Sequence, residues 1–123
     1  MIATYNNTLP FILTERTERS QIPKSVRYIV VAMAVTAIPD RAFFGLEHLT
    51  NVEIPNTVTR IGNHAFQRCK SLRSLNLPNS LTSIGKQAFG RMGLEEIDIP
   101  DSVSVIGDAA FSDCESLRRI RFP

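Results

Sequence analysis

The hydrophobic positions of the chain repeat with a period in the twenties. The pair Ala-Phe occurs four times, and its phenylalanines are 23, 23 and 22 residues apart, at Phe43, Phe66, Phe89 and Phe111. A fixed period of this length is typical of a solenoid, in which one supersecondary unit is repeated and stacked. Because a solenoid binds through an extended face, the repeat favours a recognition surface and argues against an enzyme.

Four units can be aligned, at 31–53, 54–76, 77–98 and 99–121, and Phe122 begins a fifth. Each unit carries the same ladder of apolar residues, and one slot after the Ala-Phe pair holds Leu46, Cys69, Met92 or Cys114. The third unit is one residue short, and the spacing places the deletion at Gly93. Glycine tolerates a tightened backbone best, so the ladder is expected to stay in phase on both sides.

Two kinds of segment make up each unit. The unit ends with alternating apolar and polar residues, as in Val52-Glu53-Ile54, which predicts one half-buried strand per turn and therefore a parallel sheet. The sequence Ile-Gly-x-x-Ala-Phe then predicts a brief extended piece and a helical or 3₁₀ turn, with the phenylalanines stacked in a column. Because the Ile-Gly glycines align with Pro39, we expect close packing at this slot instead of a positive φ. A proline that cannot donate to the ladder follows each strand, at Pro55, Pro78, Pro100 and Pro123.

The pattern Ile-Pro-x-x-Val-x-x-Ile-Gly-x-x-Ala-Phe-x-x-Cys-x-x-Leu, clearest in residues 54–76, resembles the BspA-type (Treponema-type) leucine-rich repeat. The whole of 31–123 fits it. The resemblance implies an α/β solenoid: a curved right-handed array with a parallel sheet, one strand per turn of about 23 residues, and short helical or 3₁₀ turns between strands. Many members are cell-surface or secreted proteins of adhesion and recognition. No catalytic residue carries over, because the family pattern has none.

The two ends of the repeat region differ. Residues 22–30 are expected to form an N-terminal cap turn, so that 22–123 is a single repeat domain preceded by an extension and partial cap at 1–21. Phe11-Ile12-Leu13-Thr14 is expected to add a short strand, and the polar stretch 14–21 a solvated turn or short helix. The last turn has no cap, so we expect a longer array, a covering partner or self-association there.

Composition narrows the classes of function. A net charge of +2 in 123 residues does not by itself indicate nucleic-acid binding, and no apolar run is long enough for a membrane span. Without a signal peptide the chain as given is expected to be cytoplasmic, or cell-surface or secreted if it belongs to a longer protein. The glycosylation sequon Asn6-Asn7-Thr8 is of a kind that is common by chance.

The cysteines suggest neither a disulfide nor a metal site. Cys69 and Cys114 occupy the same slot two units apart, roughly 10 Å in a stacked sheet, whereas a disulfide needs Cα atoms within about 7 Å. We therefore expect free, buried thiols. No cofactor or metal is predicted, because metal-ligating residues do not cluster.

The candidate site is the outward face of the parallel sheet, where an unidentified protein partner would bind. Glu96 and Asp98 are interpreted as cross-strand ion-pair partners of arginines and not as catalytic carboxylates. The face is expected to be apolar at its N-terminal edge, then acidic, then basic. Its two ladders are Tyr28, Asn51, Ser74, Glu96 and Arg119, and Val30, Glu53, Asn76, Asp98 and Arg121.

Three alternatives stay open. The outward residues could be soluble filler, or the chain could be a structural segment of a longer repeat protein. Nucleic-acid binding is less favoured, because exposed aromatic residues are lacking and acidic residues interrupt the patch. The arginines considered for it include Arg60, Arg68, Arg73, Arg118, Arg119 and Arg121.

Overall fold

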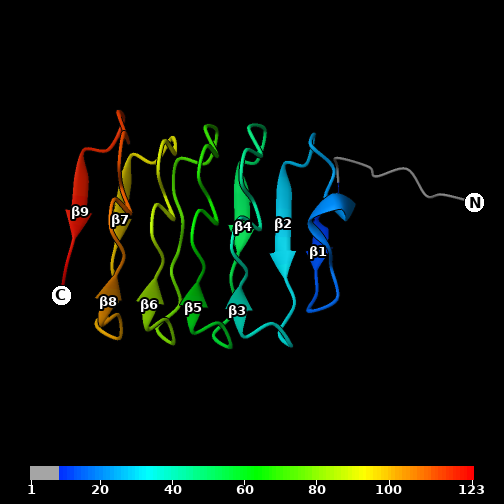
Figure 1. The fold of residues 1–123 in the computed structure, drawn as a ribbon, viewed down its shortest axis with the longest axis horizontal. Helices are drawn as coiled ribbons and strands as arrows, with labels where there is room; N and C mark the ends of the chain where they lie inside the picture. Colours follow the sequence, from blue (N-terminus) through cyan, green and yellow to red (C-terminus); the bar gives the residue numbers. More distant parts are fainter. Residues whose placement is uncertain (1–8) are drawn as a thin grey trace, which may run out of the picture.

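The computed structural model describes residues 9–123, so the Asn6-Asn7-Thr8 sequon and the start of the predicted extension lie outside the described residues. The turns of the chain stack side by side in sequence order, from β1 near one end to β9 at the other (Figure 1). The fold is a parallel-sheet solenoid of about four repeat turns. Its curvature and hand stay predictions.

One side of the solenoid carries the strands expected from the alternating segments. They are β1 (Phe11–Leu13), β2 (Tyr28–Val31), β4 (Asn51–Glu53), β7 (Glu96–Asp98) and β9 (Arg119–Arg121). They pair in parallel as β1-β2-β4 and β7-β9. In β2 the residues alternate between half-buried and buried, which is what period two requires of a strand with one face in the core.

A second parallel sheet forms on the other side. Its two-residue strands are β3 (Ala37–Ile38), β5 (Arg60–Ile61), β6 (Ser83–Ile84) and β8 (Val105–Ile106), in that order. They are the brief extended pieces expected before the Ala-Phe pair. Each of the four repeat turns therefore contributes a strand to a second sheet, which the prediction of one strand per turn did not include.

The short helical turns and the α/β class are not confirmed. Among residues 9–123 the structure has one helical element, the 3₁₀ helix η1 (Arg19–Gln21) in the polar stretch before the first repeat. The Ala-Phe segments are hydrogen-bonded turns with two left-handed residues four positions apart, such as His64 and Arg68 at φ 58° and 65°. A helix cannot continue through such residues, because right-handed φ values are needed throughout.

The left-handed residues align backbone N–H groups toward the next turn. The N–H groups of Arg41, Phe43 and Gly45 donate to the carbonyl oxygens of Asn63, Ala65 and Gln67 at 2.8–2.9 Å. The same three bonds recur at the next two turn boundaries, so we call them the turn-edge row. In this row the donors always belong to the earlier turn and the acceptors to the later one.

The phenylalanine column is confirmed. Ring centroids are 5.1 Å apart for Phe43 and Phe66, 5.7 Å for Phe66 and Phe89, and 5.4 Å for Phe89 and Phe111. The first three rings are fully buried, whereas Phe111 in the last turn is half-buried. The column therefore forms the axis of the core.

The glycine slot is one of close approach, as predicted. A Cβ added to Gly85 would lie 2.6 Å from the backbone nitrogen of Asn63, and Gly85 has no positive φ. The Gly85 N–H donates to Ile61 of the preceding turn at 2.9 Å. Pro39 takes this slot in the first repeat, where β3 is the edge strand and a donor would lack such an acceptor.

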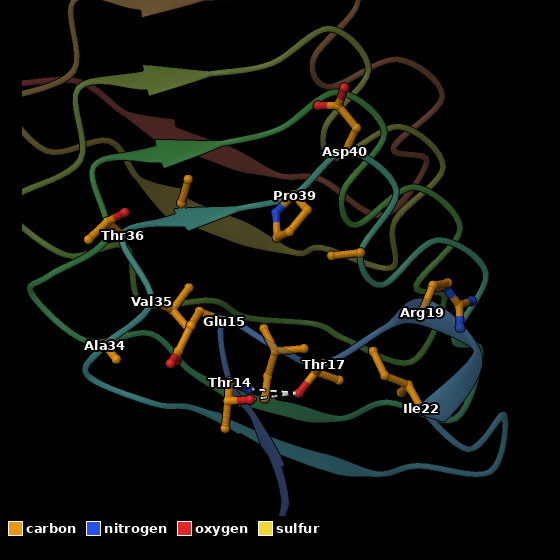
Figure 2. Close-up of a pocket in the computed structure, with 13 residues that line it drawn as sticks. Thr14, Glu15, Thr17, Arg19, Ile22, Ala34, Val35, Thr36, Pro39 and Asp40 are labelled. Carbon is orange, nitrogen blue, oxygen red and sulfur yellow. Dashed lines mark hydrogen bonds between the residues drawn. The ribbon is translucent and has the colours of Figure 1, made fainter.

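The N-terminal segment covers the first turn with a shorter loop. β1 pairs with β2 as predicted, but Phe11 opposes Ile29, an offset of 18 residues, whereas Tyr28 opposes Asn51, an offset of 23. Because this loop is shorter, it contains no strand that could pair with β3. A pocket of about 250 Å³ therefore lies between the cap and β3 (Figure 2). In Figure 2 Thr14 and Thr17 are hydrogen-bonded to each other on the cap side of this pocket. The domain boundaries stay predictions.

The last turn leaves apolar side chains exposed. Val105, Ile106 and Phe122 are 57%, 40% and 59% exposed, whereas Ile84, the equivalent of Ile106 one turn earlier, is 1% exposed. Each inner turn is covered by the turn that follows it, and residues 9–123 provide no such cover for the last.

Candidate recognition face

The outward positions of the first sheet form the candidate site. In the pairing of β2 with β4, Tyr28 opposes Asn51 and Val30 opposes Glu53, which puts each predicted ladder in register. Tyr28 and Val30 are half-buried, while Asn51 and Glu53 are exposed. The buried residues between them, such as Ile29, fix which way these side chains point.

A hydrogen bond ties the N-terminal part of this face together. The Tyr28 hydroxyl donates to a carboxylate oxygen of Glu53, diagonally across two strands. This bond, some desolvation and the negative charge of Glu53 raise the pKa of Tyr28 above its ordinary value of 10.0. The pair presents an aromatic ring beside a fixed acceptor.

The middle of the face is interrupted. Ser74 and Asn76 are exposed, as expected, but residues 72–78 form no strand and do not pair with β4 or β7. A polar crevice of about 250 Å³ lies between 74–77 and β7. The shortened third turn follows this interruption. There, a Cβ on Gly93 would lie 2.0 Å from the carbonyl oxygen of Lys70, while Met92 and Leu94 stay buried.

The C-terminal part of the face carries the predicted ion pairs. Arg119 lies opposite Glu96 and bonds it at 3.0 Å, and Arg121 lies opposite Asp98 at 3.6 Å. Their acidic neighbour Glu95 pairs with Arg73 at 3.7 Å. Acidic and basic side chains therefore neutralise one another across the strands. The face consequently has a less pronounced change from acidic to basic along the solenoid than the sequence predicted.

Nothing in the described residues builds a metal or redox site. Residues 9–123 hold no group of three or more side chains suited to a metal ion, and both cysteines are free. Cys69 is buried, and burial raises the pKa of its thiol from 9.0 to about 12. Cys114 is only half-buried, contrary to our expectation, because its turn is the last one described.

The arginines considered for nucleic-acid binding do not form one patch. Arg60 lies on the second sheet, Arg68 on the turn edge, and Arg119 and Arg121 on the first sheet. Residues 9–123 contain no helix with the length and hydrophobicity that a membrane span requires.

Sequence reasoning missed the turn edge. Of its left-handed positions only Gly45 is a glycine, and only His64 and Asp113 are of other types that adopt a positive φ more often than most. The remaining positions are Arg41, Arg68, Gln87, Arg91 and Ala109. It also missed a side-chain ladder, in which Asp40 accepts the N–H of Asn63, and Asn63 accepts that of Lys86, both at 2.8 Å. The alignment of Asp40 with Asn63 was the available signal.

Stacked turns, parallel strands and an inward apolar ladder define a protein of the leucine-rich-repeat class. The model of the BspA type leucine rich repeat region matches residues 36–123 in six copies. The chain therefore belongs to the BspA-type leucine-rich repeat family. No curated protein matches the sequence closely enough to count as a relative.

Solved structures agree with this assignment. A leucine-rich repeat protein of Bacteroides ovatus is 31% identical, with a TM-score of 0.78 over 93% of this chain and 34% of its own. A leucine rich cell surface protein of Faecalibacterium prausnitzii is 28% identical, with a TM-score of 0.54 over 80% of this chain and 33% of its own. The T. pallidum leucine-rich repeat protein is 24% identical, with a TM-score of 0.66 over 89% of this chain and 62% of its own, and shows the shared fold. The chain thus spans about a third of the first of these proteins.

Proposed function

We propose that this chain is a non-enzymatic module that recognises a protein partner through the outward face of its first sheet. One observation carries the proposal: inward positions repeat from turn to turn, whereas outward positions change in every turn. Inward, β2, β4 and β7 hold Ile29, Val52 and Ile97. Repeat proteins of this class generally bind through such extended surfaces, which supports the assignment.

The face offers three kinds of contact along its length. The Tyr28–Glu53 pair supplies an aromatic ring and an acceptor, and the crevice beside Ser74 and Asn76 supplies polar side chains. The ion pairs of β7 and β9 supply compensated charge. Because charges in such a face select partners more than they add affinity, reversing them should change the partner that binds.

A charge exchange tests the proposal without breaking the fold. The variant Glu96→Arg, Asp98→Arg, Arg119→Glu, Arg121→Glu exchanges both cross-strand pairs and leaves the net charge unchanged. The matched control, Glu47→Lys with Lys70→Glu, exchanges a pair away from this face. A protein captured from the source cells by wild type and control, but not by the face variant, would support the proposal. Equal capture by all three would refute it.

A second candidate is a structural segment of a longer repeat protein. The structures it resembles are longer, since the chain covers 34% and 33% of two of them, and the exposed Val105, Ile106 and Phe122 would suit a following turn. A partner held at this last turn instead of the first sheet would favour this candidate. If the chain is such a segment, we propose that the protein is at the cell surface or secreted. A cytoplasmic location of the chain as given is the alternative proposal.

Self-association through the last turn is also proposed, on the same exposed residues. Two identical ends could not extend the turn-edge row, because each would present N–H donors to the other. We therefore expect such a dimer to use the exposed apolar side chains and not the turn-edge row. Its concentration dependence in sedimentation equilibrium is the measurement that checks it.

A further inference from the structure

A second surface lies where the N-terminal segment meets the turn edge of the first repeat. It is a groove of about 710 Å³, separate from the first sheet, and we call it the cap groove. Arg68 of the next turn lies beside it, with its guanidinium 5.9 Å from the centroid of the Phe44 ring. Its lining consists of Arg19, Ser20, Ile22, Pro23, Lys24, Arg41 and Phe44.

The cap groove carries uncompensated positive charge. Arg19, Lys24, Arg41 and Arg68 are all exposed, and none takes part in an ion pair within residues 9–123. No acidic side chain lines the groove. Four cations without counter-charges create a positive potential that concentrates anionic groups.

Glu18 next to Arg19 and Asp40 next to Arg41 are the carboxylates nearest in sequence, and neither lines the groove or forms an ion pair with its cations. Asp40, next to Arg41, accepts the backbone N–H of Asn63 at 2.8 Å. Glu47 pairs with Lys70 at 3.7 Å. The positive charge of the groove is therefore not cancelled by the turn that forms it.

The floor of the groove is apolar. Ile22 is 4% exposed, and Pro23 and Phe44 are half-buried. Arg19 is held in place because its guanidinium donates to the Phe44 carbonyl oxygen at 2.5 Å. The Phe44 carbonyl oxygen is equivalent to the Gln67 carbonyl oxygen one turn later, which accepts the Gly45 N–H in the turn-edge row. The site thus combines a hydrogen-bonded cation, three further exposed cations and an apolar floor.

This combination selects among anionic partners. Single-stranded nucleic acid is usually held by base stacking on an open aromatic ring, and the Phe44 ring already faces the Arg68 guanidinium. A membrane surface would need protruding apolar side chains, and here they form the floor. An extended peptide can place carboxylates on the cations and one apolar side chain on the floor.

We propose that the cap groove binds an extended acidic peptide segment of a partner protein, with an apolar residue between its carboxylates. The polar stretch 14–21 then contributes to binding as well as to covering the first turn. This site acts independently of the outward sheet face.

The test is the binding of a labelled peptide by fluorescence anisotropy. The probe is a peptide of Asp and Glu with one central Leu, compared with the same peptide carrying Ser in place of Leu, with oligothymidylate and with phosphatidylserine vesicles. The groove variant is Lys24→Asn with Arg41→Asn, because asparagine tolerates the φ of 59° at Arg41. The matched control, Arg60→Asn with Arg118→Asn, removes the same charge from exposed positions outside the groove.

We expect the groove variant to bind the Leu peptide about fivefold more weakly or worse, and the control to bind it like the wild type, since each exposed charge contact contributes only part of a tenfold change. Binding should also weaken with salt. Equal losses in both variants, equal binding of the Ser peptide, or tighter binding of oligothymidylate or vesicles would each overturn the proposal.

Discussion

Replacing Phe66 with alanine tests the phenylalanine column most directly. The ring is fully buried and lies 5.1 Å and 5.7 Å from its two neighbours, Phe43 and Phe89. Truncation of a buried phenylalanine costs about 3–5 kcal/mol, and the loss of two ring–ring contacts places this case in the upper part of that range, about 4–5 kcal/mol. Since domains of this size have stabilities of about 5–15 kcal/mol, the variant should lose from about a third to nearly all of the free energy of unfolding.

Urea denaturation followed by circular dichroism measures the loss. Phe111, half-buried and with one ring neighbour at 5.4 Å, provides a graded comparison, and Phe111→Ala should cost no more than about half as much. Glu53→Ala, on the exposed face, should change the free energy of unfolding by about 0.5 kcal/mol or less. The assigned register would be wrong if Glu53→Ala unfolded the chain while Phe66→Ala left its midpoint unchanged. Equal costs at Phe66 and Phe111 would contradict the argument from burial.

Four further predictions concern the turns and the cysteines. Gly85→Ala should lower the free energy of unfolding by about 2 kcal/mol or more, measured by thermal unfolding, because its Cβ would meet backbone atoms at 2.6 Å. Gly45→Ala should lower it by about 1 kcal/mol, because its φ is 73° but no atom lies within 4 Å of the added Cβ. Asn63→Ala should cost about 1 kcal/mol by the same measurement, because a backbone N–H of the next turn loses its acceptor. At pH 9, alkylation followed by mass spectrometry should find Cys114 modified before Cys69; the reverse order would contradict the assigned burial. Because the unfolded Cys69 thiol ionises near 9.0 and the folded one near 12, its contribution to stability should be complete below pH 9 and decline between pH 9 and 12, and this decline should be absent in Cys69→Ala.

The repeat predicted the inward half of the molecule because buried slots accept few side chains. The Phe column, the close approach at Gly85 and the parallel pairing of β7 with β9 all follow from spacing and alternation. The conformation of the turn edge could not be predicted from spacing and alternation. Arg41 and Gln87 adopt positive φ because hydrogen bonds to the next turn hold them there, and neither residue type signals that conformation.

The same limit applies to the sites. The outward ladders follow from alternation, so their register could be predicted, but the missing pairing at Ser74 and Asn76 could not be, because both keep the expected spacing. The cap groove was not predicted because Arg19, Arg41 and Arg68 come from three segments that only the folded turns bring together.

The turn-edge row gives the solenoid a net dipole along the direction in which its turns stack. Its peptide groups point the same way at three successive boundaries, so their dipoles add, as they do in a helix, with the carbonyl end at the first turn and the N–H end at the last. Arg19 places a cation on the Phe44 carbonyl at the negative pole. Asp113, in the last turn, places a carboxylate near the positive pole, where it pairs with Arg91 at 3.7 Å. Each added turn would lengthen this dipole without altering its ends, so a repeat array can grow while the charges suited to its two poles stay the same.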